Sequence, residues 1–441
     1  MLRPDPARVL VRPFLPTAAL RPPGQPDPAR ALVHPVLPAT EPRQAGHAEP
    51  CRFTRVTDAV LAMDRARVEA ELAEVMRDFG GRHPGLLATL ADRFVQVCAL
   101  MPTAPTVLEE ARRLLIGAYF SLEYSFQAAA LFNPSIVPHP DQDGLAPGEA
   151  RFVLSLRATG EGHISSICFR SGVVDAGGDV RLEPPGVHAT TPYWNSPIAA
   201  DGGFEVSFAP ASLLAERVLF PITPKQRNGL EDARFVRFTE EDGTATYYAT
   251  YTAYSGSEIA PELLRTDDFV RVRFLPIAGD AVRNKGMALF PRRIGGQYLM
   301  LARLDGETVQ LTRSNDLRTW NGFETVFGPA EPWELVQIGN CGSPIELPEG
   351  WLVLTHGVGA MRRYSLGAAL LDLQNPTRVL ARLRVPLLSP DAQEREGYVP
   401  NVVYSCGGMA HAGNLILPYA MSDSATSFAV VPLRSLLAAM S

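Results

Sequence analysis

An acidic pair followed by an arginine lies near the middle of this sequence. Glu231 and Asp232 are neighbours in the segment NGLEDARFVRF, and Arg234 follows two positions later. A carboxyl group held beside an arginine can exchange a proton with a substrate, which is the task of a general acid or base. A surface ion pair on a loop explains the same residues without any chemistry. The rest of the chain has to decide between these two interpretations.

A predicted β-hairpin positions the acidic pair. The pair lies at the end of one expected strand, and a polar turn at 240–244 leads into a second strand, Ala245–Tyr254, which is rich in Tyr and Thr. Side chains alternate along a strand, so the odd-numbered residues from Tyr247 to Ala253 should share one face and the even-numbered residues the other.

The composition predicts a globular protein with a core and no nucleic-acid partner. The chain has 441 residues, of which 46% are hydrophobic and 20% charged, and its net charge is −6. Such a length is sufficient for two or three domains. The negative charge gives no electrostatic reason to expect nucleic acid or an anionic membrane. No apolar run approaches the length of a membrane span, so we expect no membrane partner.

The five cysteines are scattered and never form a C-x-x-C pair. Neither a metal site nor a disulfide framework is therefore predicted, and a reducing compartment fits best. The first residues, MLRPDPARVLVRPFLP, contain Asp and Pro early and lack an uninterrupted apolar core, unlike a secretory signal. We expect a cytoplasmic protein.

Residues 1–56 are rich in proline and contain a short internal repeat. The sequence RPDPARVLVRPFLP at Arg3–Pro16 is echoed by QPDPARALVHPVLP at Gln25–Pro38. Prolines on both sides of each apolar run exclude a helix interior, so both copies are predicted to be extended arms. Such arms lie against a larger body or against another subunit, and the second arrangement would produce a homo-oligomer.

Residues 57–131 are predicted to be helical, because apolar residues recur there at helical spacing. Three helices are expected, beginning at Thr57 or Asp58, at His83–Pro84 and at a capping box of Thr106 and Glu109, with the third ending near Leu131.

From residue 132 to residue 441 the sequence changes to short strands and turns. The clearest strands are Arg151–Arg157, Ile164–Arg170, Tyr298–Arg303, Trp351–Thr355, Leu366–Leu373, Asn414–Pro418 and Ser427–Pro432. An open sheet built from about 300 residues would leave long exposed edges, so radial repetition is favoured. The predicted fold class is all-β, and a propeller would bring loops from every blade to a central cavity.

Motifs of this β region resemble glycoside hydrolase family 130, which contains inverting mannoside phosphorylases and related β-mannosidases. NGLEDARFVRF is similar to the family's G-x-E-D-P-R segment, and RNKGMALFPRRIGGQYLMLAR resembles its basic residues, Phe-Pro pair and strand ending in Arg. WELVQIGNCGSPIELPEGWLVLTHG, YSLGAALLDLQNPTRVLAR and EREGYVPNVVYSCG resemble the blocks that follow. The resemblance covers about residues 132–430 and implies a five-bladed β-propeller with a central active site. The N-terminal helical segment lies outside it, as in a longer-chain branch of the family.

The resemblance also implies a role for individual residues. Asp232 would be the proton donor, acting through a sugar hydroxyl, while inorganic phosphate attacks with inversion and no metal or cofactor takes part. The phosphate would be bound by Arg283, Asn284, Arg303, His356 and Tyr364. The mannosyl unit would be held by Asn133, Arg157 and Asp423. The forked donors of a guanidinium suit phosphate, and the expected partners are an oligosaccharide and phosphate.

Two departures from the family pattern leave alternatives open. Ala233 replaces a proline, and Gln337 stands where phosphorylases have a lysine that contacts phosphate. Losing one cation weakens an anion site by about 1–3 kcal/mol, which brings hydrolysis into question. A hydrolase needs a carboxylate to activate water, and those available are Glu231, Glu334, Glu346, Glu394 and Glu396.

Phosphorolysis of a β-1,2- or β-1,4-linked manno-oligosaccharide remains the prediction, because Arg303 and the basic run 283–285 are retained. A glycan-binding propeller without catalysis is the remaining alternative. The acidic pair together with Arg303 and His356 argues against it.

Overall fold

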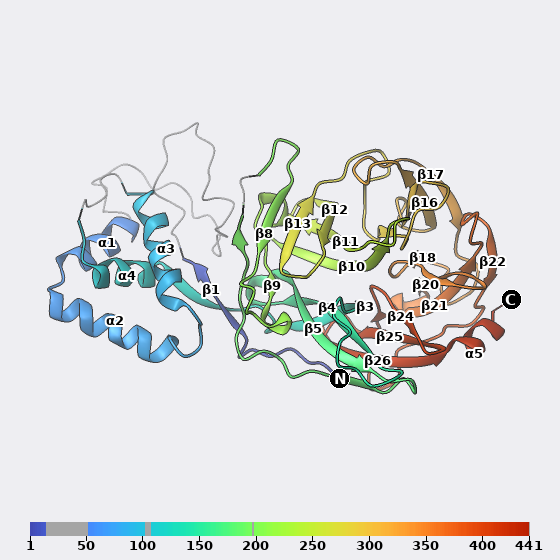
Figure 1. Cartoon of the computed structure of the whole chain (residues 1–441), viewed down its shortest axis with the longest axis horizontal. Helices are drawn as coiled ribbons and strands as arrows, with labels where there is room; N and C mark the ends of the chain where they lie inside the picture. Colours follow the sequence, from blue (N-terminus) through green and yellow to red (C-terminus); the bar gives the residue numbers. More distant parts are fainter. Residues whose placement is uncertain (15–51, 102–106, 196–197, 441) are drawn as a thin grey trace.

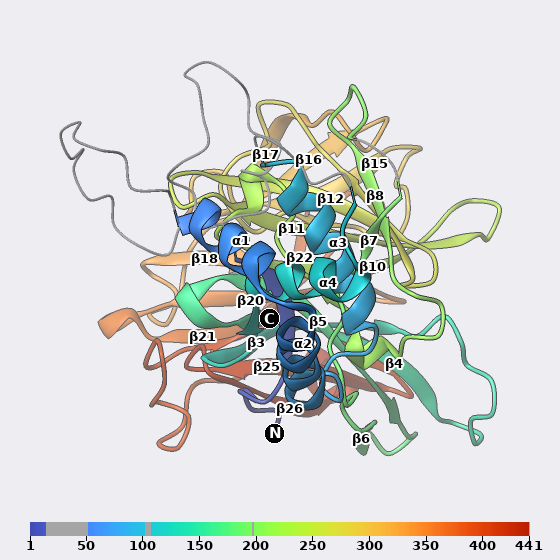
Figure 2. The ribbon, with the colours of Figure 1, turned by 90° about the vertical axis from the view of Figure 1, so that its left-hand side faces the viewer.

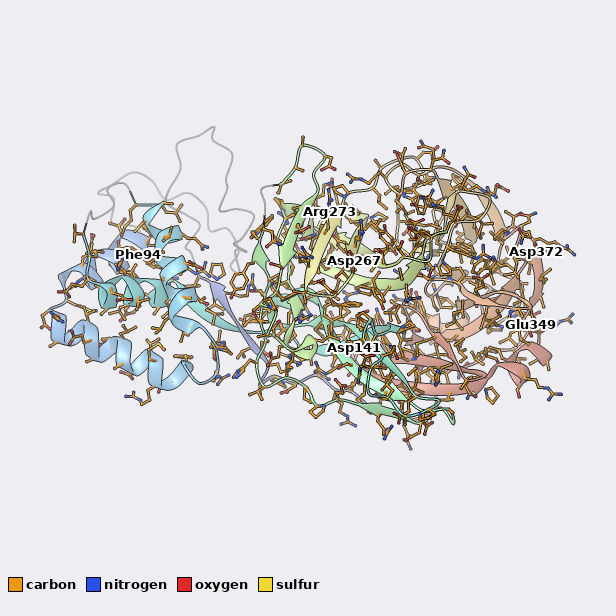
Figure 3. All side chains as sticks on the ribbon, in the orientation of Figure 1. Phe94, Asp141, Asp267, Arg273, Glu349 and Asp372 are labelled. Atoms are coloured by element: carbon orange, nitrogen blue, oxygen red, sulfur yellow. The ribbon has the colours of Figure 1, made fainter. Side chains whose placement is uncertain are left out.

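A computed structural model describes residues 1–14, 52–101, 107–195 and 198–440. Four of the described helices lie at one end of the molecule, and β-sheets make up most of the remainder. Strand β1 (Val9–Pro13) runs between the two parts (Figure 1). In a view from the helical end, the helices lie in front of the sheets (Figure 2). Side chains fill the spaces between the sheets (Figure 3).

The helical part contains α1 (Arg52–Ala62), α2 (Arg65–Phe79), α3 (Leu86–Cys98) and α4 (Glu110–Tyr119). The first predicted helix is two helices in the structure, and the break between them is a cap that the prediction missed. The Asp64 carboxylate accepts the backbone N–H of Arg67 at 2.8 Å and starts α2. Thr57, predicted as a cap, lies inside α1, where its hydroxyl donates to the carbonyl of Phe53.

The third predicted helix does not reach Leu131, and this expectation was wrong. Helix α4 ends at Tyr119, and the chain continues as strand β2 (Ser121–Ser125). Strand β2 pairs with β1, a partner more than 100 residues away that local periodicity cannot reveal. Thr106, the predicted cap of this helix, lies outside the described residues.

The first proline-rich copy is extended and lies against the body of the protein. Its strand β1 pairs antiparallel with β2, and Leu10 is only 2% exposed. The guanidinium of Arg8 donates to the carbonyls of Ala215 at 2.5 Å and His188 at 3.2 Å. The second copy, at 25–38, lies outside the described residues.

One large sheet opens the β part. Its strands are β3 (Ala130–Pro138), β4 (Ala150–Thr159), β5 (Ser165–Val174), β6 (Val180–Leu182), β7 (Tyr193–Trp194), β8 (Phe204–Ser207), β9 (Val218–Leu219), β10 (Gly229–Thr239), β11 (Ala245–Tyr254), β12 (Ile259–Thr266) and β13 (Arg271–Leu275). A parallel pairing of Gly229 with Ser165 joins β10 to β5. A Cβ at Gly229 would lie 2.8 Å from that of Ser165, so the close approach requires glycine.

Smaller antiparallel sheets follow in chain order. They consist of β14 (Ala288–Leu289), β15 (Tyr298–Ala302), β16 (Val309–Ser314) and β17 (Asn321–Phe327); then β18 (Gln337–Asn340), β19 (Ile345–Leu347), β20 (Gly350–Val358), β21 (Tyr364–Leu371) and β22 (Val379–Arg382); then β23 (Val403–Tyr404), β24 (Met409–His411), β25 (Asn414–Met421) and β26 (Ala425–Pro432). Short helix α5 (Leu433–Ala438) ends the described chain.

Shared apolar clusters join each sheet to the next. Successive clusters unite Val236 with Met300, Leu311 with Val353, Leu354 with Leu417, and Ile416 with Leu154. The final cluster brings the last sheet back to the first, and the backbone N–H of Cys406 donates to the carbonyl of Pro134 across the same junction. The sheets therefore form a closed, propeller-type ring without long exposed edges.

The hairpin that carries the acidic pair has the predicted alternation. The odd-numbered residues from Tyr247 to Ala253 all lie in one core cluster, while Tyr248 belongs to another. Glu231 and Asp232 lie close to the start of β10, and the turn to β11 lies at its other end. The acidic pair is buried, so the surface interpretation does not apply to it.

Candidate active site

Two β-bulges bring Asp232, the predicted proton donor, next to Asn133, a residue predicted to bind the sugar. The pairing register shifts between Glu231 and Arg234 on β10, and Asp232 adopts a left-handed backbone with φ 53°. Asn133, at a second register shift on β3, has φ 49°. Asp and Asn tolerate this conformation better than other non-glycine residues. The Asn133 amide donates to Asp232 Oδ1 at 2.7 Å, so both bulges direct their side chains to one point.

Arg157 fixes both carboxylates of the acidic pair. Its Nη2 lies 2.7 Å from Glu231 Oε1, and its Nη1 lies 3.2 Å from Asp232 Oδ1. Its Nε donates to the hydroxyl of Ser165 at 2.9 Å, and the guanidinium lies 4.9 Å from the centre of the Phe132 ring. The planar fork is thus held by contacts along its edges and on its face.

Lys285 and Arg234 add positive charge beside the same carboxylates. Lys285 Nζ lies 2.7 Å from Glu231 Oε2. The buried Arg234 donates to the backbone carbonyls of Asp232 at 3.0 Å and Cys341 at 2.7 Å, and to the hydroxyl of Tyr404 at 2.9 Å. Arg234 therefore ties the bulge of β10 to segments more than 100 residues later in the chain.

These charges control the protonation of Asp232. Burial by itself raises the pKa of Asp232, but the positive charges of Arg157 and Arg234 oppose it. Lys285 and the hydrogen bond from Asn133 act in the same direction, and together they lower the pKa of Asp232 to about 2. The group is therefore a carboxylate at neutral pH.

The pKa of Asp423, in the same pocket, is shifted in the opposite direction. Burial raises its pKa, and the negative charge of Asp232 raises it further, while Arg157 and Arg362 offset part of the effect. The pKa of Asp423 is about 6. Of the two carboxyl groups, Asp423 is the one that holds a proton more readily.

An arginine and a histidine form the other half of the site. Arg303 Nη1 lies 2.7 Å from His356 Nε2, and because arginine can only donate, Nε2 accepts and the imidazole is neutral. Burial lowers the pKa of His356 well below its usual value, and Arg303 lowers it further. The Tyr364 ring lies parallel to the imidazole at 6.0 Å, and the Tyr404 ring meets it edge-on at 4.9 Å. The Tyr404 ring links this half to Arg234 and the acidic pair.

Because Gly339 has no side chain, its backbone can lie close to His356 and Arg303. A Cβ at Gly339 would lie 2.6 Å from His356 Cε1 and 3.0 Å from Arg303 Cδ. Gln337 precedes it by two positions on β18 and so faces the same side of the sheet. Among the described residues, buried polar atoms without a protein partner include Arg303 Nε, Asn133 Oδ1 and Asn340 Oδ1. Such atoms are available to a bound ligand.

In the basic run 283–285, Arg283 and Asn284 were predicted to bind phosphate, and in the structure Lys285 is the residue that contacts the acidic pair. Arg283 is exposed, and its guanidinium lies 5.8 Å from the centre of the Phe323 ring. Asn284 has φ 63°, and its side-chain oxygen accepts the N–H of Lys285. The left-handed residue turns the chain so that Lys285 reaches Glu231. The sequence contained the basic run, but no signal in it distinguished Lys285 from its neighbours.

A small pocket adjoins the acidic pair at the mouth of the site. Its lining includes Arg157, Asp423, His163 and Tyr398. The rings of His163 and Tyr398 lie 5.6 Å apart at 32°. Trp194 is not part of this lining, and its ring packs on that of Phe204 at 5.0 Å.

The other carboxylates considered as water-activating bases lie elsewhere. Glu334 is fully buried and pairs with Arg382 at 2.6 Å, and Glu346 pairs with Arg292 at 2.6 Å. Glu394 accepts the hydroxyl of Tyr419 at 2.7 Å, and Glu396 lines a groove beside the N-terminus. Glu231 lies next to Asp232, but both of its oxygens are engaged by cations.

Within the described ranges, no group of three or more His, Cys, Asp or Glu side chains is arranged to hold a metal ion. The described cysteines, Cys98, Cys168, Cys341 and Cys406, are free thiols. No helix in the same ranges is long and apolar enough to cross a membrane.

Sequence comparison relates this chain to a known family of enzymes. The model of glycoside hydrolase family 130, described as β-1,4-mannooligosaccharide phosphorylase, matches residues 204–441. The 1,2-β-oligomannan phosphorylase of Thermoanaerobacter sp. (strain X514) is 32% identical over 220 residues, which are 48% of this chain and 72% of the relative. The β-1,2-mannobiose phosphorylase of Listeria innocua is 33% identical over 216 residues, which are 47% of this chain and 58% of the relative.

Solved structures share the fold over a longer part of the chain. The β-1,2-mannobiose phosphorylase from Listeria innocua, in complex with β-1,2-mannobiose, aligns with a TM-score of 0.50 and 25% identity. That alignment covers 70% of this chain and 92% of the other. A glycosidase structure from Bacteroides thetaiotaomicron aligns with a TM-score of 0.52 at 18% identity and covers 70% of this chain and 89% of its own, a likeness in fold.

Proposed function

This chain belongs to glycoside hydrolase family 130, and from that premise we propose that it is an inverting β-mannoside phosphorylase. It cleaves β-1,2- or β-1,4-linked manno-oligosaccharides with inorganic phosphate and releases mannose 1-phosphate. Relatives named for β-1,2 linkages support the first substrate, and a relative and the family model named for β-1,4 linkages support the second. The free thiols are consistent with work in the reducing cytoplasm.

The proposed scaffold is a five-bladed propeller. The large first sheet divides at the pairing of Gly229 with Ser165 into two blades, one built on β3–β5 and the other on β10–β13. The three smaller sheets supply the remaining blades. Proposed site residues lie on β3, β4, β10 and β20 and directly after β15, and the ends of such strands meet at the centre of a propeller.

One observation carries the functional proposal: a buried carboxyl group for proton transfer and a set of anion-binding groups share one site. Asp232 is linked through Arg234 and Tyr404 to His356, which in turn accepts a hydrogen bond from Arg303. Phosphate attacking the anomeric carbon needs cations on its side of the sugar, and the departing sugar oxygen needs a proton on the other.

Phosphate binding would also prepare Asp232 for its role. The pKa of Asp232 is low because Arg157, Arg234 and Lys285 lie near its carboxylate. A bound phosphate anion beside Lys285 and Arg303 offsets part of that positive charge, so the pKa of Asp232 rises. The proton then passes from Asp232 through a sugar hydroxyl to the leaving oxygen. Asn133, Arg157 and Asp423 orient the mannosyl unit through hydrogen bonds.

Lys285 compensates for the lysine that Gln337 replaces. Without a cation at position 337 the anion site lacks one positive charge. Lys285 supplies that charge from the connection between β13 and β14. Hydrolysis is the second candidate function, favoured by Gln337 itself. Its base would be Glu231, which first has to release Arg157 or Lys285.

Product analysis tests the proposal. β-Mannobioses of defined linkage should yield mannose 1-phosphate only when phosphate is present. Free mannose released at the same rate without phosphate would establish the hydrolase instead. Asp232→Asn should reduce turnover by orders of magnitude while sugar affinity persists, whereas a protein that only binds glycans has no turnover to lose.

A further inference from the structure

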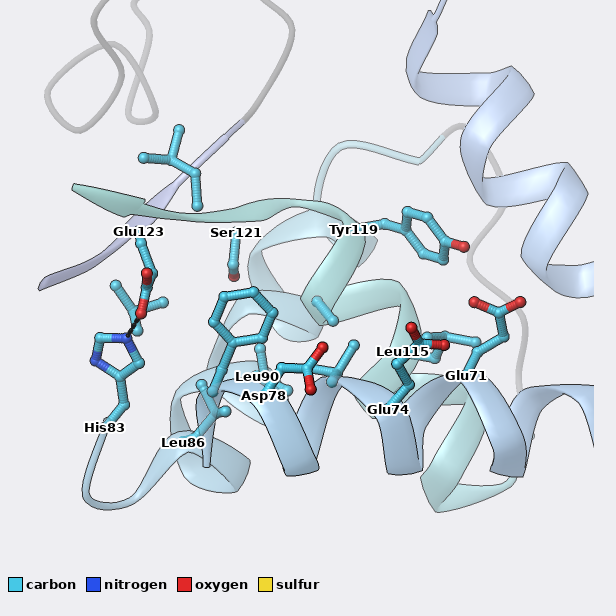
Figure 4. A pocket seen from close by; sticks show the side chains of 15 residues that line it. Glu71, Glu74, Asp78, His83, Leu86, Leu90, Leu115, Tyr119, Ser121 and Glu123 are labelled. Atoms are coloured by element: carbon cyan, nitrogen blue, oxygen red, sulfur yellow. Dashed lines mark hydrogen bonds and ion pairs between the residues drawn. The ribbon is translucent and has the colours of Figure 1, made fainter. Parts of the chain in front are cut away.

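The helical part contains a groove that the catalytic proposal does not use. It encloses about 330 Å³ between helix α2, helices α3 and α4, and strands β1 and β2. Leu86, Leu90 and Leu115 contribute to its apolar floor (Figure 4). Two large side chains in its lining remain partly exposed, Phe79 at 38% and Tyr119 at 43%. An apolar surface left open in this way is characteristic of a docking site.

Acidic residues surround this floor. Glu71, Glu74 and Asp78 line the groove from α2, and Glu123 lines it from β2 (Figure 4). No Lys or Arg is among the described residues that line it, and His83 is held by Glu123 at 2.6 Å. Just outside the lining, Arg82 lies 3.0 Å from Glu123 and Arg77 lies 3.3 Å from Asp78. Glu71 and Glu74 lie 3.8 Å from Arg67 and Arg77, so these exposed pairs are weak and a basic occupant can replace them. The groove therefore suits an occupant that is apolar along one face and positively charged.

The first proline-rich copy shows how such a segment binds this protein. Val11 of β1 forms part of the groove wall, while its neighbour Leu10 is buried on the other side. Arg12 places its guanidinium 4.6 Å from the Tyr124 ring. Backbone pairing with β2 completes the contact. The motif thus docks as an extended strand with alternating apolar anchors and basic groups.

The second copy repeats these determinants. Ten of fourteen positions are identical between 3–16 and 25–38, and Arg30, Leu32 and Val33 correspond to Arg8, Leu10 and Val11. The stretch 29–38, ARALVHPVLP, carries Arg30 and His34 and no acidic residue. Its prolines favour an extended conformation, so little conformational entropy is lost when it binds.

We propose that the acidic groove is the docking site of residues 29–38 of the same chain. The leucine and valine side chains of that stretch cover the apolar floor, and Arg30 and His34 face the acidic rim. Fourteen residues separate Phe14 from this stretch and thirteen separate it from α1, so each connection spans up to roughly 45 Å. Both ends start beside the helical part, which favours binding within one chain over binding to a second copy.

Photocrosslinking in the full-length chain tests the proposal. The probe is p-benzoylphenylalanine at Val36, whose counterpart in the first copy is Phe14, so an aromatic side chain is compatible with the motif. Mass spectrometry should locate the crosslinks on α2 and α3 near Phe79 and Leu86. The same probe at Ala18, in the same segment but outside the copy, should not enrich crosslinks there. Crosslinks that match the Ala18 control, or that lie outside the residues lining the groove, would overturn the proposal.

Two further comparisons identify the forces and the partner. Reversing the rim charges with Glu74→Arg and Asp78→Arg should lower the crosslink yield about tenfold, whereas Glu69→Arg on the same helix should not. In a mixture of ¹⁴N- and ¹⁵N-labelled chains, crosslinks should join residues of equal label. Mixed-label crosslinks in the groove would show that a second copy is the occupant and would refute docking within one chain.

Discussion

Replacing Lys285 with glutamine removes the charge that we propose replaces the missing lysine at position 337. Lys285 Nζ lies 2.7 Å from Glu231, and its side chain is 33% exposed. Glu231 keeps its bond to Arg157 in the variant. Because Lys285 is partly solvated, the free energy of unfolding should fall by about 1 kcal/mol or less.

The effect on phosphate should be much larger. A hydrogen bond from a charged group contributes about 1.5–3 kcal/mol, so Lys285→Gln should lower kcat/KM for phosphate about 10- to 150-fold. The loss should appear in KM for phosphate, while KM for the mannoside changes little. Removing the cation also raises the pKa of Asp232, since Lys285 is one of the charges that lower it. Because the proton donor must be protonated to act, the alkaline limb of the pH profile should therefore move to higher pH.

Initial rates of mannose 1-phosphate formation, with phosphate varied at saturating β-mannobiose, measure this effect. Lys225→Gln is the matched control, because Lys225 is the other lysine of the sequence and is exposed on the short helix η3 (Pro224–Gln226). An unchanged KM for phosphate in Lys285→Gln would refute the assignment. A large drop in melting temperature would show that the lysine acts on the fold instead.

Further substitutions test other parts of the site. Gly339→Ala places a Cβ 2.6 Å from His356 Cε1. The variant should raise KM for phosphate about tenfold in the same assay. Unchanged kinetics would mean that this contact does not shape the anion site. Tyr398→Ala removes an aromatic ring at the pocket mouth and should raise KM for the sugar acceptor about 2- to 12-fold in the synthetic direction, with Tyr398→Phe close to wild type. The raised pKa of Asp423 means that its contribution to stability is full below pH 3.8 and is lost as pH rises through about 6. Relative to the wild type, the Asp423→Asn variant should therefore become more stable as pH rises over that range. Melting temperatures of both proteins at pH 4 and pH 7 measure this effect. A difference between variant and wild type that is the same at both pH values would refute it.

The sequence determined the features that depend on near neighbours in the chain. Alternation along Ala245–Tyr254 predicted which face of β11 enters the core, and the structure has that arrangement. The short strands of the β part were predicted because β-branched and aromatic residues recur between turn residues. The motif order identified the family, and it predicted Asp232 and Arg303 as site residues without any knowledge of their surroundings.

Tertiary structure decided the rest, because the deciding partners are distant in the chain. The expected helix to Leu131 ends at Tyr119, since β2 gains a strand partner from the N-terminus. Lys285 rather than Arg283 reaches the acidic pair, because the left-handed backbone at Asn284 turns the chain toward a carboxylate 54 residues earlier.

Protonation of the pocket is also a tertiary property. Asp232 and Asp423 are the same residue type, yet the pKa of one is lowered to about 2 and that of the other is raised to about 6. The difference comes from which cations the folded strands bring within a few ångströms of each carboxyl group. Sequence fixes the residue types available for chemistry, while folding sets the distances and the burial on which their charges depend.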